Sequence, residues 1–212
     1  MKKIIVVVFV SLLILSACNR SNKKTSENPQ DSVSHILSND VEELQDLSEV
    51  ITRFVRAYAS QDEAKLNSLL HAELGLTIIY RPGASDNFIT VDSIDLAHPV
   101  PDYYPYPSLE NTYALTFGSL PKFDCGTEKW DKQGLVCDTT IHPTQLTQIA
   151  LFEKEFNEAT YSRAALEEIR NRENASFRVI VTAKNPLVFH VQKYKGRWYV
   201  SVLDRAYGGC DA

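Results

Sequence analysis

The sequence predicts an α+β fold in which N-terminal helices pack on a curved, mostly antiparallel sheet. Apolar residues recur at helical spacing between residues 41 and 58, and apolar and polar residues alternate as in strands between residues 177 and 203. A long insertion rich in proline and tyrosine, residues 92–143, separates the two patterns. The folded part, residues 39–212, is long enough for a single domain with one hydrophobic core.

The first helix is predicted over residues 41–58. Its apolar side consists of Val41, Leu44, Leu47, Val50, Ile51, Phe54, Val55 and Tyr58. Asp40 followed by Glu43 resembles a capping box at its start. A second, short helix should start within residues 60–63 and end before Gly75, because a glycine allows the chain to turn there. The buried side of this helix is expected to be Leu66, Leu69 and Leu70.

Two strands should come next, over residues 75–81 and 87–91, because Pro82-Gly83 between them is typical of a turn. Inside the insertion we predict one strand, YALTF (113–117), and ordered loops elsewhere. Two further helices are predicted over residues 145–157 and 161–171.

The C-terminal part should form a three-stranded meander over residues 177–183, 187–194 and 197–203. The two-residue turn Lys195-Gly196 predicts the register of the last hairpin. Counted from that turn, Val191 should face Val200, and Phe189 should face Val202. The opposite face should carry His190, Gln192 and Tyr194 against Ser201, Tyr199 and Arg197.

This order of elements is similar to the cone-shaped α+β domains of the nuclear-transport-factor-two-like family. The resemblance covers residues 41–91 and about 145–205, and it implies a curved sheet around a pocket. The insertion departs from the family pattern. The chain also resembles a group of uncharacterised bacterial lipoproteins that carry stretches such as LTIIYRPGA, PDYYPYP, FDCGTEKW and LDRAYGGCDA, a likeness that implies no activity.

The N-terminus has the parts of a secretory signal: Lys2 and Lys3, an apolar segment from Ile4 to Leu15, and small residues before Cys18. The sequence Leu15-Ser16-Ala17-Cys18 resembles the bacterial lipobox. The resemblance implies cleavage after residue 17, acylation of Cys18 (palmitate and related chains) and a membrane anchor. Residues 18–38 are polar and should form a flexible stalk.

Charge and export limit the partners. Loss of residues 1–17 changes 22 basic and 27 acidic residues to 20 and 27, a side-chain net charge of about −7. An acidic body argues against nucleic acid as a partner. Basic residues after Cys18, in place of an acidic surface-export run, favour the outer membrane facing the periplasm. The expected partners are therefore the membrane, through the lipid, and an unknown small molecule, glycan or envelope protein.

Three cysteines remain after Cys18 is acylated. An exported chain favours a disulfide, and we predict Cys125–Cys137 because the segment between them contains two glycines. Cys210 would compete for either partner. A zinc site of Cys125, Cys137 and His142 is disfavoured because a fourth ligand is missing, and we expect no metal and no cofactor.

Two groups of side chains are candidates for ligand binding. The first is a polar stripe on the C-terminal strands, made of Arg178, His190, Gln192, Tyr199 and Ser201, which would line a pocket if helices cover that face and would be a solvated surface otherwise. The second is PDYYPYP (101–107), whose Tyr103, Tyr104 and Tyr106 would either form a rigid stacking platform or attach the long loop to the body. Arg81, Asp204 and Arg205 at strand ends are interpreted as structural.

No common catalytic motif is present, among them G-x-S-x-G, H-E-x-x-H, the P-loop and G-x-G-x-x-G. The leading hypothesis is a lipid-anchored, non-catalytic binding module of the cell envelope, and we name no catalytic residue. One alternative is an enzyme that uses His190 in a cone pocket. Another is a structural or assembly lipoprotein that docks on an envelope protein.

Overall fold

The structure is a computed structural model that describes residues 29–110, 112–156 and 161–207. The chain divides into two units, residues 1–39 and Asp40–Ala212. Helix α1 (Pro29–Ala59) begins within the segment predicted to be a stalk, and its residues from Asp40 onward belong to the larger unit. The larger unit has an α+β fold, which confirms the predicted class.

Four helices and nine strands are described. The remaining helices are α2 (Glu63–Asn67), α3 (Gln145–Phe156) and α4 (Arg163–Asn174). The strands are β1 (Leu76–Tyr80), β2 (Asn87–Val91), β3 (Leu115–Phe117), β4 (Phe123–Asp124), β5 (Lys129–Trp130), β6 (Leu135–Asp138), β7 (Ser176–Val181), β8 (Leu187–Tyr194) and β9 (Arg197–Asp204).

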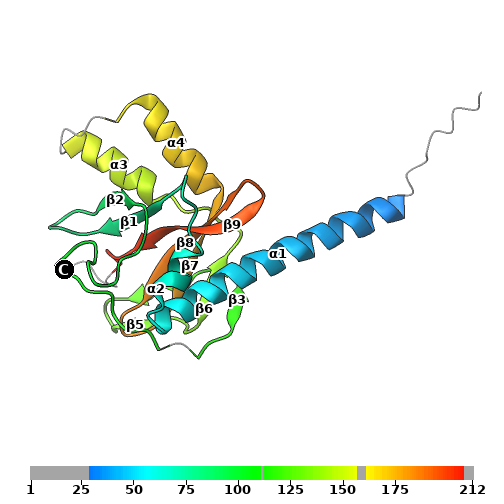
Figure 1. Cartoon of the computed structure of the whole chain (residues 1–212), viewed down its shortest axis with the longest axis horizontal. Helices are drawn as coiled ribbons and strands as arrows, with labels where there is room; N and C mark the ends of the chain where they lie inside the picture. Colours follow the sequence, from blue (N-terminus) through cyan, green and yellow to red (C-terminus); the bar gives the residue numbers. More distant parts are fainter. Residues whose placement is uncertain (1–28, 111, 157–160, 208–212) are drawn as a thin grey trace, which may run out of the picture. The chain divides into compact units, whose positions relative to one another are not determined.

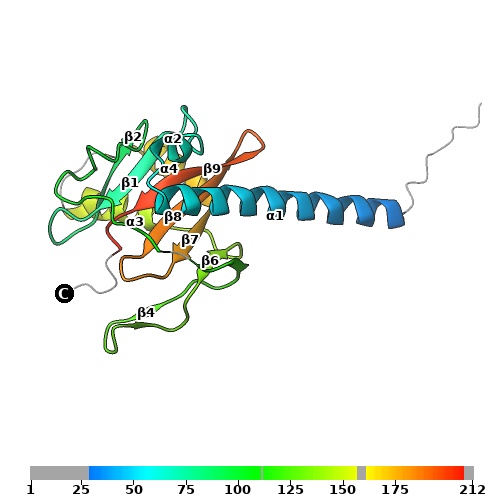
Figure 2. The same ribbon diagram turned by 60° about the horizontal axis from the view of Figure 1, so that its bottom comes forward.

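Seven of the strands form one sheet in the order β2-β1-β9-β8-β7-β6-β3. Four of the six neighbouring pairs are antiparallel, while β1–β9 and β3–β6 are parallel. Strands β4 and β5 form a separate two-stranded ribbon, which extends from the body in Figure 2.

Each face of the sheet is covered by helices (Figures 1 and 2). One face packs on α1 and α2, and its core includes Phe54, Leu66 and Phe189. The other face packs on α3 and α4, in a smaller apolar cluster formed by Ile79, Leu146, Ile149, Val202 and Ala206. Burial on both faces explains the runs of consecutive buried residues in β1, at the start of β8 and at the end of β9.

The register of the last hairpin differs from the prediction at one point. Val191 pairs with Val200 as expected, but Phe189 pairs with Leu203 and His190 pairs with Val202. A β-bulge between His190 and Val191 leaves Ser201 as an extra residue in β9, and an extra residue moves the following side chains to the opposite face. Val202 therefore belongs to the cluster under α3 and not to the face that carries Phe189.

Candidate functional site

The predicted polar stripe lies under helices and is mostly buried. Arg178 pairs with His190 across β7 and β8, and His190 pairs with Val202, whose side chain packs under α3. His190, Gln192 and Ser201 are buried, while Tyr199 is half-buried against the His71 ring, at a centroid distance of 4.9 Å. Arg178 lines two of the cavities described below. The other four stripe residues line none of them.

Arg178 is held by two side chains from other elements. Its Nη2 lies 2.9 Å from Oδ2 of Asp204 at the end of β9. The side-chain amide of Gln145, at the start of α3, lies on the other side. When the amide is oriented to satisfy its neighbours, Oε1 accepts from Nη1 of Arg178 at 2.6 Å and Nε2 donates to Nε2 of His190 at 3.2 Å.

His190 is fully buried within this network. Burial, together with the neighbouring positive charge of Arg178, lowers the pKa of His190 to about 3. The imidazole is therefore neutral at physiological pH, and a neutral ring that accepts at Nε2 carries its proton on Nδ1. Nδ1 has no hydrogen-bond partner among the described residues, and no carboxylate there is bonded to the ring. His190 is thus poorly suited to proton transfer.

Asp204 connects the network to the chain beyond the sheet. Its Oδ1 accepts hydrogen bonds from the backbone N–H groups of Ala206 at 3.2 Å and Tyr207 at 3.1 Å. Burial raises the pKa of this carboxyl group, and Arg178 acts in the opposite direction. The Tyr207 ring then lies over the Arg178 guanidinium, 5.2 Å from ring centre to Cζ.

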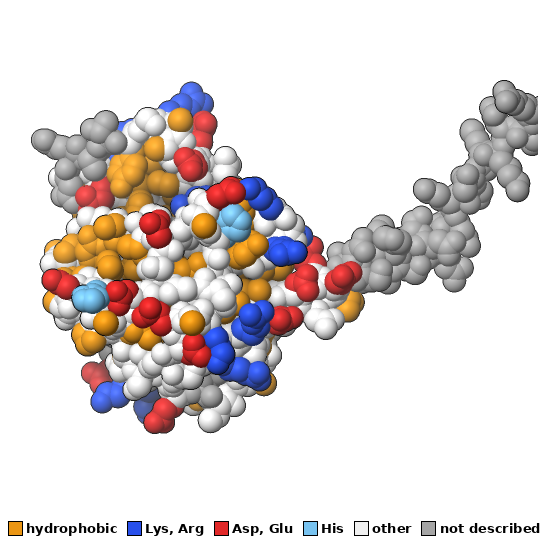
Figure 3. Space-filling model, viewed as in Figure 1, with side chains coloured by type: hydrophobic (Ala, Val, Ile, Leu, Met, Phe, Trp, Pro, Cys, Tyr) orange, Lys and Arg blue, Asp and Glu red, His pale blue; other side chains and the backbone are white. Residues whose placement is uncertain are grey.

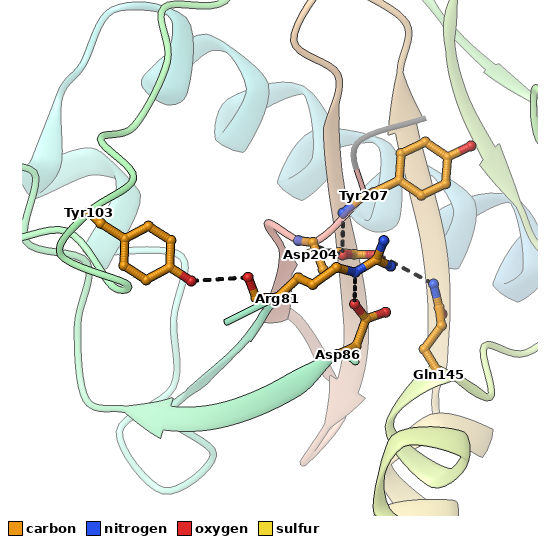
Figure 4. Close-up of polar contacts among 7 residues, drawn as sticks. Arg81, Asp86, Tyr103, Gln145, Asp204 and Tyr207 are labelled. Atoms are coloured by element: carbon orange, nitrogen blue, oxygen red, sulfur yellow. Dashed lines mark hydrogen bonds and ion pairs between the residues drawn. The ribbon is translucent and has the colours of Figure 1, made fainter. Parts of the chain in front are cut away.

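A cleft of about 490 Å³ opens beside the network, and we call it the α3 cleft. Polar or charged side chains line it, namely Arg81, Ser85, Asp86, Gln145, Gln148, Arg178, Asp204 and Tyr207. Its apolar wall consists of Ile79, Ala84, Ile149, Phe152 and Ala206. Figure 4 shows Arg81 and Asp86 from the β1–β2 connection beside Gln145 from the start of α3 and Asp204 from the end of β9, with Tyr207 just after it. The cleft is more polar than most small-ligand sites, and it combines one apolar wall with several convergent polar groups.

The cleft contains a second ion pair. Nε of Arg81, directly after β1, lies 2.6 Å from Oδ1 of Asp86 in the β1–β2 turn. Both side chains are about one-third exposed, so that solvent screens this pair more than Arg178–Asp204. The backbone carbonyl of Arg81 accepts a hydrogen bond from the Tyr103 hydroxyl at 3.1 Å (Figure 4).

The wall formed by α3 is attached to α4 through Glu173. This buried carboxylate accepts hydrogen bonds from the backbone N–H of Leu146 at 2.7 Å and from Thr147 at the first turn of α3. The Glu173 carboxylate thus pairs with backbone N–H groups at the start of α3, which have no partner within the helix. Glu173 therefore positions Gln145, which immediately precedes this turn.

The tyrosines of PDYYPYP attach the long loop to the body. Tyr106 is buried and packs edge-on against Tyr58, and the Arg205 guanidinium lies 4.1 Å from its ring centre. Arg205 also donates to the backbone carbonyls of Val100 and Tyr104. Tyr103 is 62% exposed but is tethered by its hydroxyl group. The loop is thus pinned chiefly by Arg205 and Tyr106.

The predicted Cys125–Cys137 disulfide is wrong in this structure, because Cys137 is a free, fully buried thiol on β6. Cys125 is not a free thiol. The other predicted partner, Cys210, and the lipidation residue, Cys18, lie outside the described residues. Within the described ranges, no group of three or more His, Cys, Asp or Glu side chains is arranged to hold a metal ion.

Comparisons of the chain with protein-family models, with curated proteins and with solved structures found no match. No helix in the described part of the chain is both long and apolar enough to cross a membrane.

Sequence reasoning identified Arg178 but missed most of the cleft. Asp204 and Arg81 drew attention as charged residues at strand ends and were interpreted as structural, and both do form ion pairs. Gln145 and Phe152 belong to a correctly predicted helix, but no local signal marks them as lining a cavity. Asp86 lies in a turn, where an aspartate is ordinary.

Proposed function

We propose that this chain is a lipid-anchored, non-catalytic binding protein of the cell envelope, whose ligand occupies the α3 cleft. The observation that carries the proposal is the cleft itself, which combines an apolar wall with fixed hydrogen-bonding groups at its floor. The lipobox around Cys18 supports the anchor, and the resemblance to the cone-shaped family is supported by the order of elements alone.

A binding role agrees with the way the polar groups are held. Arg178 and Asp204 satisfy one another, and Gln145 bridges Arg178 and His190, so that the floor of the cleft is rigid. A rigid site loses little conformational freedom when a ligand binds. The enzyme alternative has less support, because His190 is fully buried and does not line the cleft.

The docking alternative has one specific observation in its favour. Leu151, Phe152 and Phe156 are exposed on α3, where hydrophobic side chains gather in Figure 3. Phe152 also lines the α3 cleft, while Leu151 does not. Phe156 packs on the Phe152 ring, at a centroid distance of 4.7 Å. Variants of Phe152 and Leu151 therefore distinguish a ligand in the cleft from a partner that covers the outer surface of α3.

The proposal is tested by a thermal-shift screen of the full chain in a detergent without a sugar headgroup. The panel contains envelope glycans, peptides and lipids. A ligand at 100 times its dissociation constant stabilises the folded state by about 2.7 kcal/mol. We expect at least one hit that Phe152→Ala abolishes and Leu151→Ala retains. Hits lost with Leu151→Ala alone, or a panel without any hit, would contradict a cleft-binding function.

A further inference from the structure

A second cavity, which we call the insertion cleft, adjoins the α3 cleft. This cavity of about 600 Å³ is lined by residues of the insertion, by the segment before α3 and by Arg178 and Ile180. Four residues line both cavities: Gln145, Gln148, Arg178 and Tyr207. The two cavities therefore lie on either side of these shared side chains, and we call them together the groove. A groove with two compartments suits a chain of linked units better than one compact molecule.

The charges along the groove cancel. The α3 cleft contains two arginines and two aspartates, and these form the ion pairs Arg81–Asp86 and Arg178–Asp204. The insertion cleft adds one more charge of each sign, Lys122 and Asp138. Because a strongly charged polymer is attracted by an excess of the opposite charge, this balance favours a ligand without net charge.

The groove combines flat polar side chains with apolar surface. The carboxylate of Asp86 accepts a hydrogen bond from Arg81, and the amides of Gln145 and Gln148 are held by Arg178 and Thr144, so that these flat polar groups are fixed in the groove. Phe152, which is 42% exposed, and Ile141, which is 68% exposed, offer apolar surface in the two compartments. A sugar ring has the matching shape, because hydroxyl groups surround its edge and C–H groups cover its faces.

The position of the groove argues against an extended peptide. A peptide bound to a sheet commonly pairs its backbone with an open strand edge. The edge strands of this sheet are β2 and β3, whereas the groove crosses the face under α3 and contacts the central strands through Arg178 and Asp204. A peptide here would have few backbone partners for its own N–H and C=O groups.

We propose that the groove binds a neutral oligosaccharide chain, with consecutive sugar units in the α3 cleft and the insertion cleft. This inference rests on the proposed binding function and names its ligand class. Arg178, Gln145 and Gln148 lie where the two units join, so that they contact the linkage region of the chain. Phe152 packs on a sugar face in the first compartment, and Ile141 does so in the second.

The experiment is calorimetric titration of the full chain, in a detergent without a sugar headgroup, with oligomers of N-acetylglucosamine and of glucose from one to six units. We expect affinity to increase by about tenfold between the shortest oligomers that bind and those that fill both compartments. Phe152→Ala should weaken all binding by about tenfold, and Ile141→Ala should weaken only the longer oligomers. Exposed residues outside the groove supply matched controls, Leu151→Ala and Ile89→Ala, which should bind as the parent does.

Three results would overturn the inference. Equal affinity for short and long oligomers would refute a chain that spans both compartments. Binding that survives Phe152→Ala and Ile141→Ala together would place the saccharide elsewhere. The absence of saccharide binding, together with a peptide or lipid hit that depends on Phe152, would refute the ligand class while leaving the proposed function intact. If no ligand of any class depends on Phe152, both proposals fail.

Discussion

The guanidinium group of Arg178 and the carboxylate of Asp204 lie 2.9 Å apart, on β7 and β9, with β8 between their strands. The two side chains are only 19% and 6% exposed, so that this ion pair is shielded from solvent. Asp204 also holds the backbone of Ala206 and Tyr207. One carboxylate thus fixes both the floor of the α3 cleft and the path of the chain after β9.

Replacement of Asp204 should therefore be costly. Asp204→Ala leaves the Arg178 charge without its partner and removes the acceptor for two backbone N–H groups, and we expect a loss of about 3–5 kcal/mol in the free energy of unfolding. Asp204→Asn retains an acceptor oxygen, and its free energy of unfolding should fall by less than that of Asp204→Ala. Urea denaturation at pH 7 measures both. The matched control is Asp46→Asn, an exposed position on α1, where the denaturation midpoint should stay unchanged; equal effects at the two positions would contradict this account.

His190 should make stability depend on pH. Its pKa is about 3 in the folded protein, against an ordinary value of 6.5, so that below pH 6.5 the unfolded chain binds a proton that the folded chain does not. The stability contributed by the neutral ring is therefore present above pH 6.5 and is lost as the pH falls toward 3, by up to about 1.4 kcal/mol per pH unit.

Comparison with His190→Gln isolates this effect, because the variant cannot titrate at this position. We expect the parent to lose more unfolding free energy than the variant between pH 7 and pH 4, measured by denaturation at each pH. The charged neighbour Arg178 and the amide of Gln145 face the ring, and both are present in the parent and in the variant. Parallel pH profiles for the two proteins would show that His190 is not held neutral.

Much of the fold was predictable from local patterns. Predicted helices and strands agree with α1 to α4 and with β1, β2, β3, β7, β8 and β9 to within a few residues, apart from the earlier start of α1 at Pro29. Strand β6 was missed because Leu135–Asp138 is short, buried along its whole length and therefore without alternation. The bulge at His190 was also missed, since the turn at Lys195-Gly196 determines the register only as far as the ladder stays regular.

The site was less predictable because its residues meet only through tertiary contacts. The β7 and β8 strand pattern correctly placed Arg178 and His190 on one face. Whether that face was covered depended on where α3 packs, and α3 is positioned by Glu173 on another helix. No spacing in the sequence relates Gln145 to Arg178, which are on different elements. Local patterns therefore revealed the polar face but not the cleft beside it.

Arg205 should control the order of the long loop. Its planar guanidinium group donates to several carbonyl groups of that loop, including Pro105 at 2.9 Å, and packs on the rings of Tyr104 and Tyr106. A lysine cannot reproduce this fork, so that Arg205→Lys should cost about 1–2 kcal/mol and speed chymotrypsin cleavage after Tyr103. Arg197→Lys, at an exposed position on β9, is the control. Identical cleavage rates in both variants would argue against a clamp by Arg205.

The cysteines give the sharpest chemical prediction. Cys137 is buried, and its burial together with the neighbouring Asp138 carboxylate raises the pKa of its thiol to about 12, so that native Cys137 should resist alkylation and react only after unfolding. The Tyr207 ring stacks on Trp130 at a centroid distance of 5.9 Å, in the ribbon that carries Cys125 at its turn. Cys210 follows three residues after Tyr207, within about 10 Å of extended chain.

We therefore predict a Cys125–Cys210 disulfide in the exported protein, which should stabilise it by about 2–4 kcal/mol. Mass spectrometry of an unreduced digest should identify a peptide that links these two residues, with Cys137 alkylated only in denaturant. Cys210→Ser should expose Cys125 to alkylation, whereas Cys137→Ser should leave the linked peptide in place. A linked Cys125–Cys137 peptide from the folded protein would contradict the buried, free thiol on β6, because a thiol that pairs with Cys125 must leave the core between β3 and β7.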